Sequence, residues 1–134
     1  MSHSEIVEML RRHGVTPTPQ RVEVAEILLD RPRHMSADQI LDRLRENGSG
    51  VSKATVYNSL NLFGEKGLVR ELSVDPSRKF YDSTTHPHHH FYHVDSGELS
   101  DIPEDRLTII GVPPLPEGTE QESVEVLIRV RDRQ

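Results

Sequence analysis

The stretch that decides the fold reads VSKATVYNSLNLFGEKGLVRELSVDPSRKFYD and spans residues 51–82. In its first half, apolar residues recur at helical spacing, at Val56, Leu60 and Phe63. Ser52, a good N-cap residue, precedes them, and the pattern predicts a helix over residues 53–66. In its second half, residues 68–74 and 78–82 are strand-like and flank an Asp-Pro-Ser turn, which predicts a β-hairpin.

Three further helices are predicted upstream, over residues 4–13, 19–30 and 36–47. Thr18 followed by Pro19 is a favourable helix start, and Ser36 with Gln39 forms a capping-box pattern. Helices followed by a hairpin are the layout of a winged helix-turn-helix. The fold class expected is α+β, with this N-terminal winged helix-turn-helix followed by a small, truncated α/β-type dimerisation domain.

The exposed face of the helix over 53–66 is polar and nearly free of acidic residues, which suits entry into the DNA major groove. Its members are Lys53, Thr55, Tyr57, Asn58, Ser59 and Asn61. Arg70, Arg78 and Lys79 of the hairpin could neutralise phosphates. An ordinary solvated helix face is the alternative, and the helices-plus-hairpin layout favours DNA.

Charge separates the 134-residue chain into two parts. The net charge is −6, yet residues 1–82 hold 12 basic and 12 acidic residues, and residues 83–134 hold 4 and 10. We therefore expect a winged-helix DNA-binding domain over 1–82 and a metal-binding dimerisation domain over 83–134. There is no cysteine, which excludes disulfides and Cys-type zinc sites. Without a membrane-spanning run or a signal peptide, we expect a cytoplasmic protein that does not contact membranes.

The second part begins with a histidine-rich stretch, HPHHHFYH, at residues 86–93. On an extended chain His88 and His90 share one face and His89 points to the other. With nearby Asp82 and Asp101, this pair suits a divalent ion of the Mn, Fe, Co, Ni or Zn kind. A solvated loop or an expression tag is the alternative, although a tag is unexpected at mid-chain.

Short strands are predicted in the rest of this part, at residues 91–94, 98–100, 107–110 and 122–131. The last alternates, with Val124, Val126, Ile128 and Val130 on one face, which is typical of a half-buried strand. A proline-rich connector occupies residues 112–118. About 50 residues with so little apolar material would be marginally stable alone, so we expect a homodimer.

Several motifs resemble the ferric uptake regulator family of bacterial metal-responsive repressors, over nearly the whole chain. They are TPQR at 18–21, HMSADQI at 34–40, VSKATVYNSL at 51–60, Phe63, GLV at 67–69 and the histidine stretch. The resemblance implies a homodimer that binds a double-stranded DNA operator and is not an enzyme. It places Tyr57 on the recognition helix, and the DNA-binding set we expect is Arg21, Ser52, Lys53, Thr55, Tyr57, Asn58, Arg70 and Lys79.

The resemblance also implies a regulatory metal between the two domains. The peroxide-sensing branch uses a His-Asp-His-His-Asp set, which corresponds here to His34, at the opening of the third helix, and to Asp82, His88, His90 and Asp101. One regulatory site per chain for Mn²⁺, Fe²⁺ or Zn²⁺ is expected. The family's zinc cysteines are missing, with His93 and Ser96 where the first pair would stand, so no structural zinc site of the four-cysteine type is expected.

Within the family, the chain looks most like the heme-responsive iron response regulator branch. The features are the His-His-His segment, the Leu-Ser-Asp-Ile-Pro stretch at 99–103, the proline-rich connector and the alternating Val-Glu-Val strand. The branch implies a repressor of iron and heme genes. Its Cys-Pro heme motif is absent, so His88, His89 and His90 are the candidate heme ligands, with His89 the candidate axial one.

Three alternatives remain open. A peroxide-sensing, or manganese- or iron-sensing, repressor of the same family would use the same five ligands. A non-heme iron enzyme would use a 2-His-1-carboxylate set, although no nucleophile or acid–base pair is apparent. A purely structural metal site would not change DNA binding. The roles of His86, His89 and His93, including a second, weaker site with His93 or Glu98, are undecided by the sequence.

Overall fold

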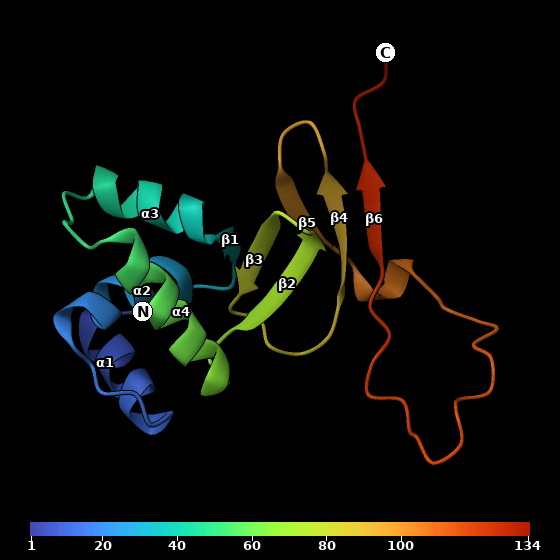
Figure 1. Cartoon of the computed structure of the whole chain (residues 1–134), viewed down its shortest axis with the longest axis horizontal. Coiled ribbons are helices and arrows are strands. Elements are labelled where there is room, and N and C mark those ends of the chain that lie inside the picture. The colour runs from blue at the N-terminus through green and yellow to red at the C-terminus, as the bar shows by residue number, and fades with distance from the viewer. The chain divides into compact units, whose positions relative to one another are not determined.

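The computed structural model describes residues 1–134 except the side chain of Asp75. The chain forms two compact units, Met1–Thr85 and His86–Gln134, here called the N-terminal and C-terminal units. Figure 1 shows the helices gathered in the N-terminal unit, whereas the C-terminal unit consists of strands and a long connector. Each unit is described by itself.

Four α-helices build the N-terminal unit: α1 (His3–Arg12), α2 (Pro19–Leu29), α3 (Ala37–Glu46) and α4 (Lys53–Glu65). The starts of α2, α3 and α4 are the predicted ones, since Thr18, Ser36 and Ser52 each accept a hydrogen bond from a backbone N–H of the first turn. α1 begins one residue earlier than predicted, with Ser2 as its N-cap. The capping box with Gln39 is complete. The hydrogen bonds that cap these helix starts are therefore local in sequence.

Three of these helices end in the same way. Gly14, Gly48 and Gly67 adopt φ values of 76°, 80° and 78°, a left-handed conformation that glycine takes without steric cost. The next residue then donates its N–H back to a carbonyl of the last helical turn, as Leu68 does to Phe63 at 2.9 Å. The three helices end at Arg12, Glu46 and Glu65, each one residue before the predicted end.

A three-stranded antiparallel sheet, of order β1-β3-β2, completes the N-terminal unit. Its strands are β1 (His34–Ser36), β2 (Arg70–Asp75) and β3 (Arg78–Asp82). The predicted hairpin is present, although β2 begins two residues later than expected. β1 was not predicted, and it corrects one detail: His34 lies on a strand before α3 rather than opening the helix.

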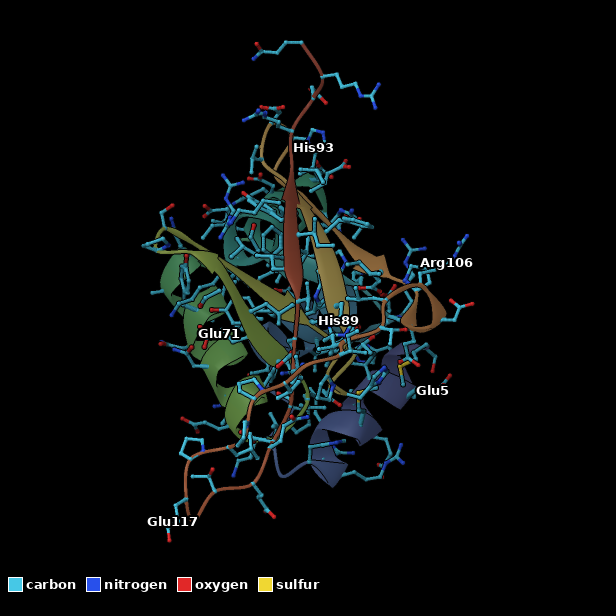
Figure 2. All side chains as sticks on the ribbon, turned by 90° about the vertical axis from the view of Figure 1, so that its right-hand side faces the viewer. Glu5, Glu71, His89, His93, Arg106 and Glu117 are labelled. Atoms are coloured by element: carbon cyan, nitrogen blue, oxygen red, sulfur yellow. The ribbon has the colours of Figure 1, made fainter. Side chains whose placement is uncertain are left out.

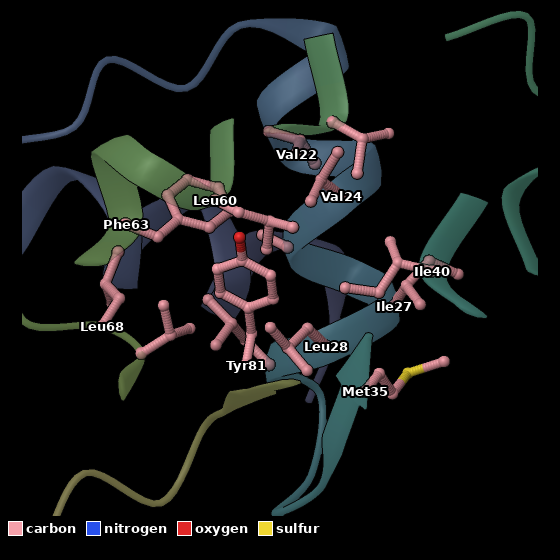
Figure 3. Close-up of a cluster of buried hydrophobic side chains, with 14 of the residues drawn as sticks. Val22, Val24, Ile27, Leu28, Met35, Ile40, Leu60, Phe63, Leu68 and Tyr81 are labelled. Carbon is pink, nitrogen blue, oxygen red and sulfur yellow. The ribbon is translucent and has the colours of Figure 1, made fainter. Parts of the chain in front are cut away.

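The apolar core of the N-terminal unit is formed where the four helices meet the sheet. Figure 3 shows Leu60 and Phe63 of α4 packed beside Leu28 of α2, with the ring of Tyr81 reaching in from β3. Phe63, Leu60 and Leu28 are fully buried. Burial raises the pKa of the Tyr81 phenol above its usual value, because the anion would lose its hydration.

The C-terminal unit contains a second three-stranded sheet, of order β5-β4-β6. Its strands are β4 (His89–His93), β5 (Glu98–Ile102) and β6 (Leu127–Val130), with one 3-10 turn, η1 (Glu104–Arg106). β4 and β5 form the predicted hairpin, which turns at Gly97 with φ 75°. β6 pairs in parallel with β4.

Two strand predictions in this unit were wrong. Residues 107–110 form no strand, and Ile110 is 87% exposed. The alternating segment over 122–131 is a strand only at Leu127–Val130, and Val124 and Ile128 remain 36% exposed. The alternating apolar residues were expected to mark a strand face that packs against another layer, but no layer of this unit covers that face. Residues 107–126 instead form an open connector between η1 and β6 (Figure 1).

None of the described helices is long and apolar enough to cross a membrane.

Candidate functional site

The first polar cluster lies within the C-terminal unit, on one face of the β4–β5 hairpin. His90 and Asp101 are directly opposite each other in the antiparallel register. The Nε2 atoms of His88 and His90 lie 3.1 and 3.2 Å from the same oxygen, Oδ1 of Asp101. The two imidazole rings are 4.2 Å apart, and both histidines are more than 90% buried. The predicted sharing of one face by His88 and His90 is therefore observed.

The hydrogen-bond pattern of His88 suits a metal ligand. Its Nδ1 lies 2.9 Å from the carbonyl oxygen of His86, and a carbonyl only accepts, so Nδ1 carries the hydrogen. In neutral imidazole Nε2 then presents a lone pair to the Asp101 carboxylate, and either a proton on Nε2 or a metal ion between the two atoms removes their repulsion. Metal-ligating histidines usually donate their other N–H to a carbonyl or carboxylate in this way. The residues present fit a divalent ion.

The other two predicted ligands lie together in the N-terminal unit. His34 on β1 and Asp82 on β3 are register partners, so their side chains share a face of that sheet. Asp82 is 2% exposed and accepts a hydrogen bond from the backbone N–H of Thr84 at 2.8 Å. Its other cross-strand neighbour is Arg70. A buried carboxylate between an imidazole and a guanidinium can serve as a metal ligand or as the partner of the arginine.

The remaining histidines of β4 point to the opposite face and hold β6 in place. The Nδ1 of His89 accepts a hydrogen bond from the backbone N–H of Val126 at 2.8 Å. The Nε2 of His93 lies 2.9 Å from Oδ1 of Asp132, just beyond β6. Figure 2 shows the two residues at opposite ends of β4. His89, the candidate axial heme ligand, thus has one ring nitrogen already occupied.

His93 is also part of a second group of metal-ligating side chains, with Asp95 and Asp132. The sequence singled out His93 but not Asp132, which is 39 residues away along the chain. Glu98, the other residue considered there, lies opposite His93 in the strand register but is not part of this group. His86 is exposed, with its Nε2 at 3.5 Å from Glu104.

The predicted DNA-contacting residues of α4 are on its exposed side. Tyr57 is 38% exposed and Asn58 and Lys53 are exposed as well, whereas Ser59, assigned to the same polar face, is buried. Ser52 and Thr55 are joined by their hydroxyls at 2.9 Å, so both take part in the helix cap. The exposed side chains that remain available to contact base edges are thus those of Tyr57 and its neighbours on α4.

Three cations of the predicted DNA-binding set, Lys53, Lys79 and Arg21, are already held by the protein. Lys53 pairs with Asp38 at 3.3 Å, and Lys79 of the wing pairs with Glu71 at 3.0 Å. Arg21 donates from Nη1 to the carbonyl of Thr16 at 3.0 Å. Both lysine pairs are solvent-exposed, and such pairs contribute only about 0–1 kcal/mol, so a phosphate can displace the carboxylate.

Comparison with known proteins decides the family. Residues 12–124 match the ferric uptake regulator family. This chain belongs to that family. Members of the ferric uptake regulator family are metal-responsive transcriptional regulators rather than enzymes, and they are dimeric DNA-binding proteins. The predicted fold class and the non-enzymatic role are thereby confirmed, and the iron-oxygenase alternative is removed.

Individual relatives cover most of the chain. The peroxide-responsive repressor PerR of Staphylococcus aureus is 34% identical over 106 residues, which are 79% of this chain and 72% of that protein. A ferric uptake regulator from Pseudomonas aeruginosa, solved with manganese, superposes with a TM-score of 0.69 at 26% identity and full coverage of both chains. PerR from Streptococcus pyogenes superposes with a TM-score of 0.51 at 29% identity, over 74% of this chain and 68% of that chain.

Proposed function

We propose that this protein is a homodimeric repressor whose binding to a double-stranded DNA operator is controlled by one divalent metal ion per chain. The proposed ligands are His34, Asp82, His88, His90 and Asp101. The observation that carries the proposal is the convergence of two buried imidazole nitrogens on one Asp101 oxygen, with His88 oriented by the His86 carbonyl. Nitrogen and oxygen donors of this kind suit Mn²⁺, Fe²⁺ or Zn²⁺.

The ligand set explains how metal binding would reach the DNA-binding unit. Three ligands belong to the C-terminal unit, and His34 and Asp82 belong to the sheet that carries the wing. Only five residues of chain lie between Asp82 and His88, which limits their separation to about 20 Å. An ion held by both groups would fix the angle between the units, and thereby the spacing of the two α4 helices in a dimer.

As the first candidate signal we propose iron status, which the protein would sense by binding heme. Its targets would be iron and heme genes. This rests on the resemblance to the iron response regulator branch and on the candidate ligands His88, His89 and His90. Because Nδ1 of His89 accepts the Val126 N–H, the hydrogen of the neutral ring is on Nε2, so an axial bond from His89 would require loss of that hydrogen or of the Val126 hydrogen bond. Heme binding through His88 or His90 would compete with the divalent ion.

A peroxide-sensing repressor is the second candidate, and the relatives favour it. The Staphylococcus aureus protein is a peroxide-responsive repressor, and the Streptococcus pyogenes structure describes peroxide sensing and gene regulation by PerR. The same five ligands would serve here. Its signature would be one added oxygen on His34 or His88 after peroxide treatment of the iron-loaded protein. Mass spectrometry of peptides containing each histidine separates this candidate from the first.

The deciding experiment is DNA binding to an iron-gene promoter fragment by metal-stripped protein, then with Mn(II), then with heme. Binding switched on by Mn(II) and off by heme supports the first candidate. A response to Mn(II) and peroxide but not heme moves the assignment to the second. DNA affinity unchanged by chelation would leave a structural metal site and contradict both.

Tyr57→Ala provides the control for the DNA contact. Loss of a base contact should cost about 1–3 kcal/mol of specific binding and leave non-specific binding nearly unchanged. An unchanged ratio of specific to non-specific affinity would remove Tyr57 from base recognition. Tyr57 is exposed, so its replacement should leave the helix content unaltered.

A further inference from the structure

We propose that a cavity between α4 and the β2–β3 wing binds a small linear diamine, a molecule that is positively charged at both ends and apolar in the middle. The cavity has a volume of about 560 Å³, which is in the range of small-molecule sites. Its lining comes from α4, from β2 with the residue before it, and from β3, all within the N-terminal unit.

Tyr81 supplies the observation that points to a ligand. This residue is only 3% exposed and lines the cavity, and Figure 3 shows its hydroxyl end directed toward α4 near Leu60, another residue of the lining. The hydroxyl has no hydrogen-bond partner among the described residues. Buried tyrosine hydroxyls usually find a partner, so this one is available to a molecule in the cavity. Because burial raises the pKa of the phenol, the hydroxyl keeps its proton and can both donate and accept.

Two carboxylates of the lining determine the charge of the ligand. Glu65, the last residue of α4, is exposed and forms no ion pair or hydrogen bond within the part of the chain that the structure describes. Glu71 of β2 is the register partner of Tyr81, so their side chains share a face of the sheet. Arg70, which also lines the cavity, is the partner of Asp82, so its side chain leaves the other face. Two acidic groups beside a neutral hydroxyl favour a ligand with two positive charges.

Other parts of the lining are apolar or lack a side chain. Leu60 and Val69 are both buried. Gly64 lies one helical turn after Leu60, and a Cβ added there would meet no heavy atom within 4 Å beyond its own helix. Glycine inside a helix is less stable than alanine, and here it leaves room beside α4. The methylene groups of a diamine can therefore cover Leu60 and Val69 while its ends reach the carboxylates.

An occupied cavity would act on DNA binding through Lys79, a consequence that rests on the proposed function. The Nζ atom of Lys79 lies 3.0 Å from Oε1 of Glu71, and both side chains are exposed. An exposed pair of this kind is weak, so an ammonium group can replace the lysine at Glu71. The released Lys79 can then contact a DNA phosphate. A diamine in the cavity should therefore strengthen DNA binding.

The test of the site is a titration of the full-length protein with 1,4-diaminobutane, followed by amide NMR without DNA. Wild-type protein should show saturable shifts around Glu65 and Tyr81. Glu65→Gln and Tyr81→Phe should each weaken binding about tenfold. Glu46→Gln is the matched control, because Glu46 is the exposed last residue of α3 and lies outside the lining. 1,4-Butanediol has the same length without charge, and binding as tight as that of the diamine would overturn the proposal.

Two further variants separate a binding role from a structural one. Tyr81→Phe should be as stable as wild type without diamine, since the hydroxyl has no partner to lose, and a marked loss of stability would mean that the hydroxyl serves the fold. Gly64→Leu fills the cavity and should abolish the shifts while keeping the helix signal. Shifts that persist in Gly64→Leu would place the diamine elsewhere. The absence of saturable shifts in wild type would mean that the cavity holds only water.

DNA binding tests the coupling separately. Diamines also bind DNA, so wild type is compared with Gly64→Leu at each diamine concentration, where that effect is the same. Wild type should gain about threefold in affinity over Gly64→Leu, and Lys79→Ala should remove the gain. Diamine binding without any gain contradicts the release of Lys79. Absence of specific DNA binding by wild type contradicts the proposed function and leaves the NMR result on the cavity intact.

Discussion

The two units are stabilised by different interactions. The N-terminal unit has a continuous core of fully buried side chains from four helices and a strand, Phe63 and Leu60 among them. In the C-terminal unit the buried apolar side chains among the described residues are Tyr92, Leu99 and Ile102. Its other ordered contacts are largely those of histidines with carboxylates and backbone groups.

This difference means that the fold of one unit is stable without metal, whereas the stability of the other can respond to metal. Hydrophobic burial needs no bound ion, so the N-terminal unit should keep its fold whatever the metal supply. Contacts built from imidazoles and carboxylates change when an ion binds, so the C-terminal unit is the part whose stability can follow metal concentration. A metal sensor needs both properties, and here they occupy different parts of the chain.

The largest expected effect is on the apolar core. Phe63→Ala should lower the free energy of unfolding of the N-terminal unit by about 3–5 kcal/mol, because it removes a fully buried ring. Urea denaturation followed by the helical circular dichroism signal measures it. Phe91→Ala is the matched control, since Phe91 is 37% exposed on the other unit. An equal loss in both variants would contradict the division between the units.

The next effect should be measurable in the C-terminal unit, which supplies three of the five proposed ligands. Mn(II) at about a hundred times its dissociation constant should stabilise that unit by about 2.7 kcal/mol, measured by hydrogen exchange of the β4 amides. His90→Ala should remove this gain and leave helix content unchanged. His86→Ala should retain it, because the exposed His86 side chain is not a proposed ligand and its carbonyl persists. A gain that survives in His90→Ala would refute the ligand assignment.

A smaller effect is expected where His89 holds the start of β6. His89→Ala removes the acceptor for the Val126 N–H and should cost about 1–3 kcal/mol locally. Faster hydrogen exchange at the Val126 amide is the readout. His89→Asn, whose amide oxygen can also accept, should restore part of the protection. Unchanged exchange in His89→Ala would show that β6 is held by its strand pairing alone.

The smallest effect concerns a helix cap of the N-terminal unit. Thr18→Ala should destabilise that unit by about 1 kcal/mol, because Thr18 Oγ1 accepts the N–H of Arg21 at the start of α2. Thermal unfolding measures it, and Thr18→Ser should be nearly neutral. Mn(II) affinity should be the same in both variants. A change in affinity would mean that the core and the metal centre are more closely coupled than we infer.

Sequence predicted the parts of the molecule that depend on neighbouring residues. The caps at Thr18, Ser36 and Ser52 are local and were placed correctly, and the helix ends before the glycines were placed to within one residue. The sharing of a face by His88 and His90 follows from strand geometry alone, and the structure adds the converging Asp101.

Features that depend on distant residues were missed. β1 is three residues long and exists only through its pairing with β3. The extent of β6 was overestimated, because alternation in a sequence implies a covered face only if another layer is present. The contact between His93 and Asp132 joins residues 39 apart, and no local pattern predicts it.

The alternation of the histidine stretch also makes it sensitive to length. His90 and Asp101 lie on one face of the sheet while His89 and His93 lie on the other, because consecutive strand residues point to opposite faces. Deleting one residue from 86–93 would barely alter composition, yet it would exchange the two faces. Imidazoles meant for an ion would then meet backbone amides, and both functions would be lost together. Substitutions in this stretch can be compensated one at a time, whereas an insertion or deletion cannot.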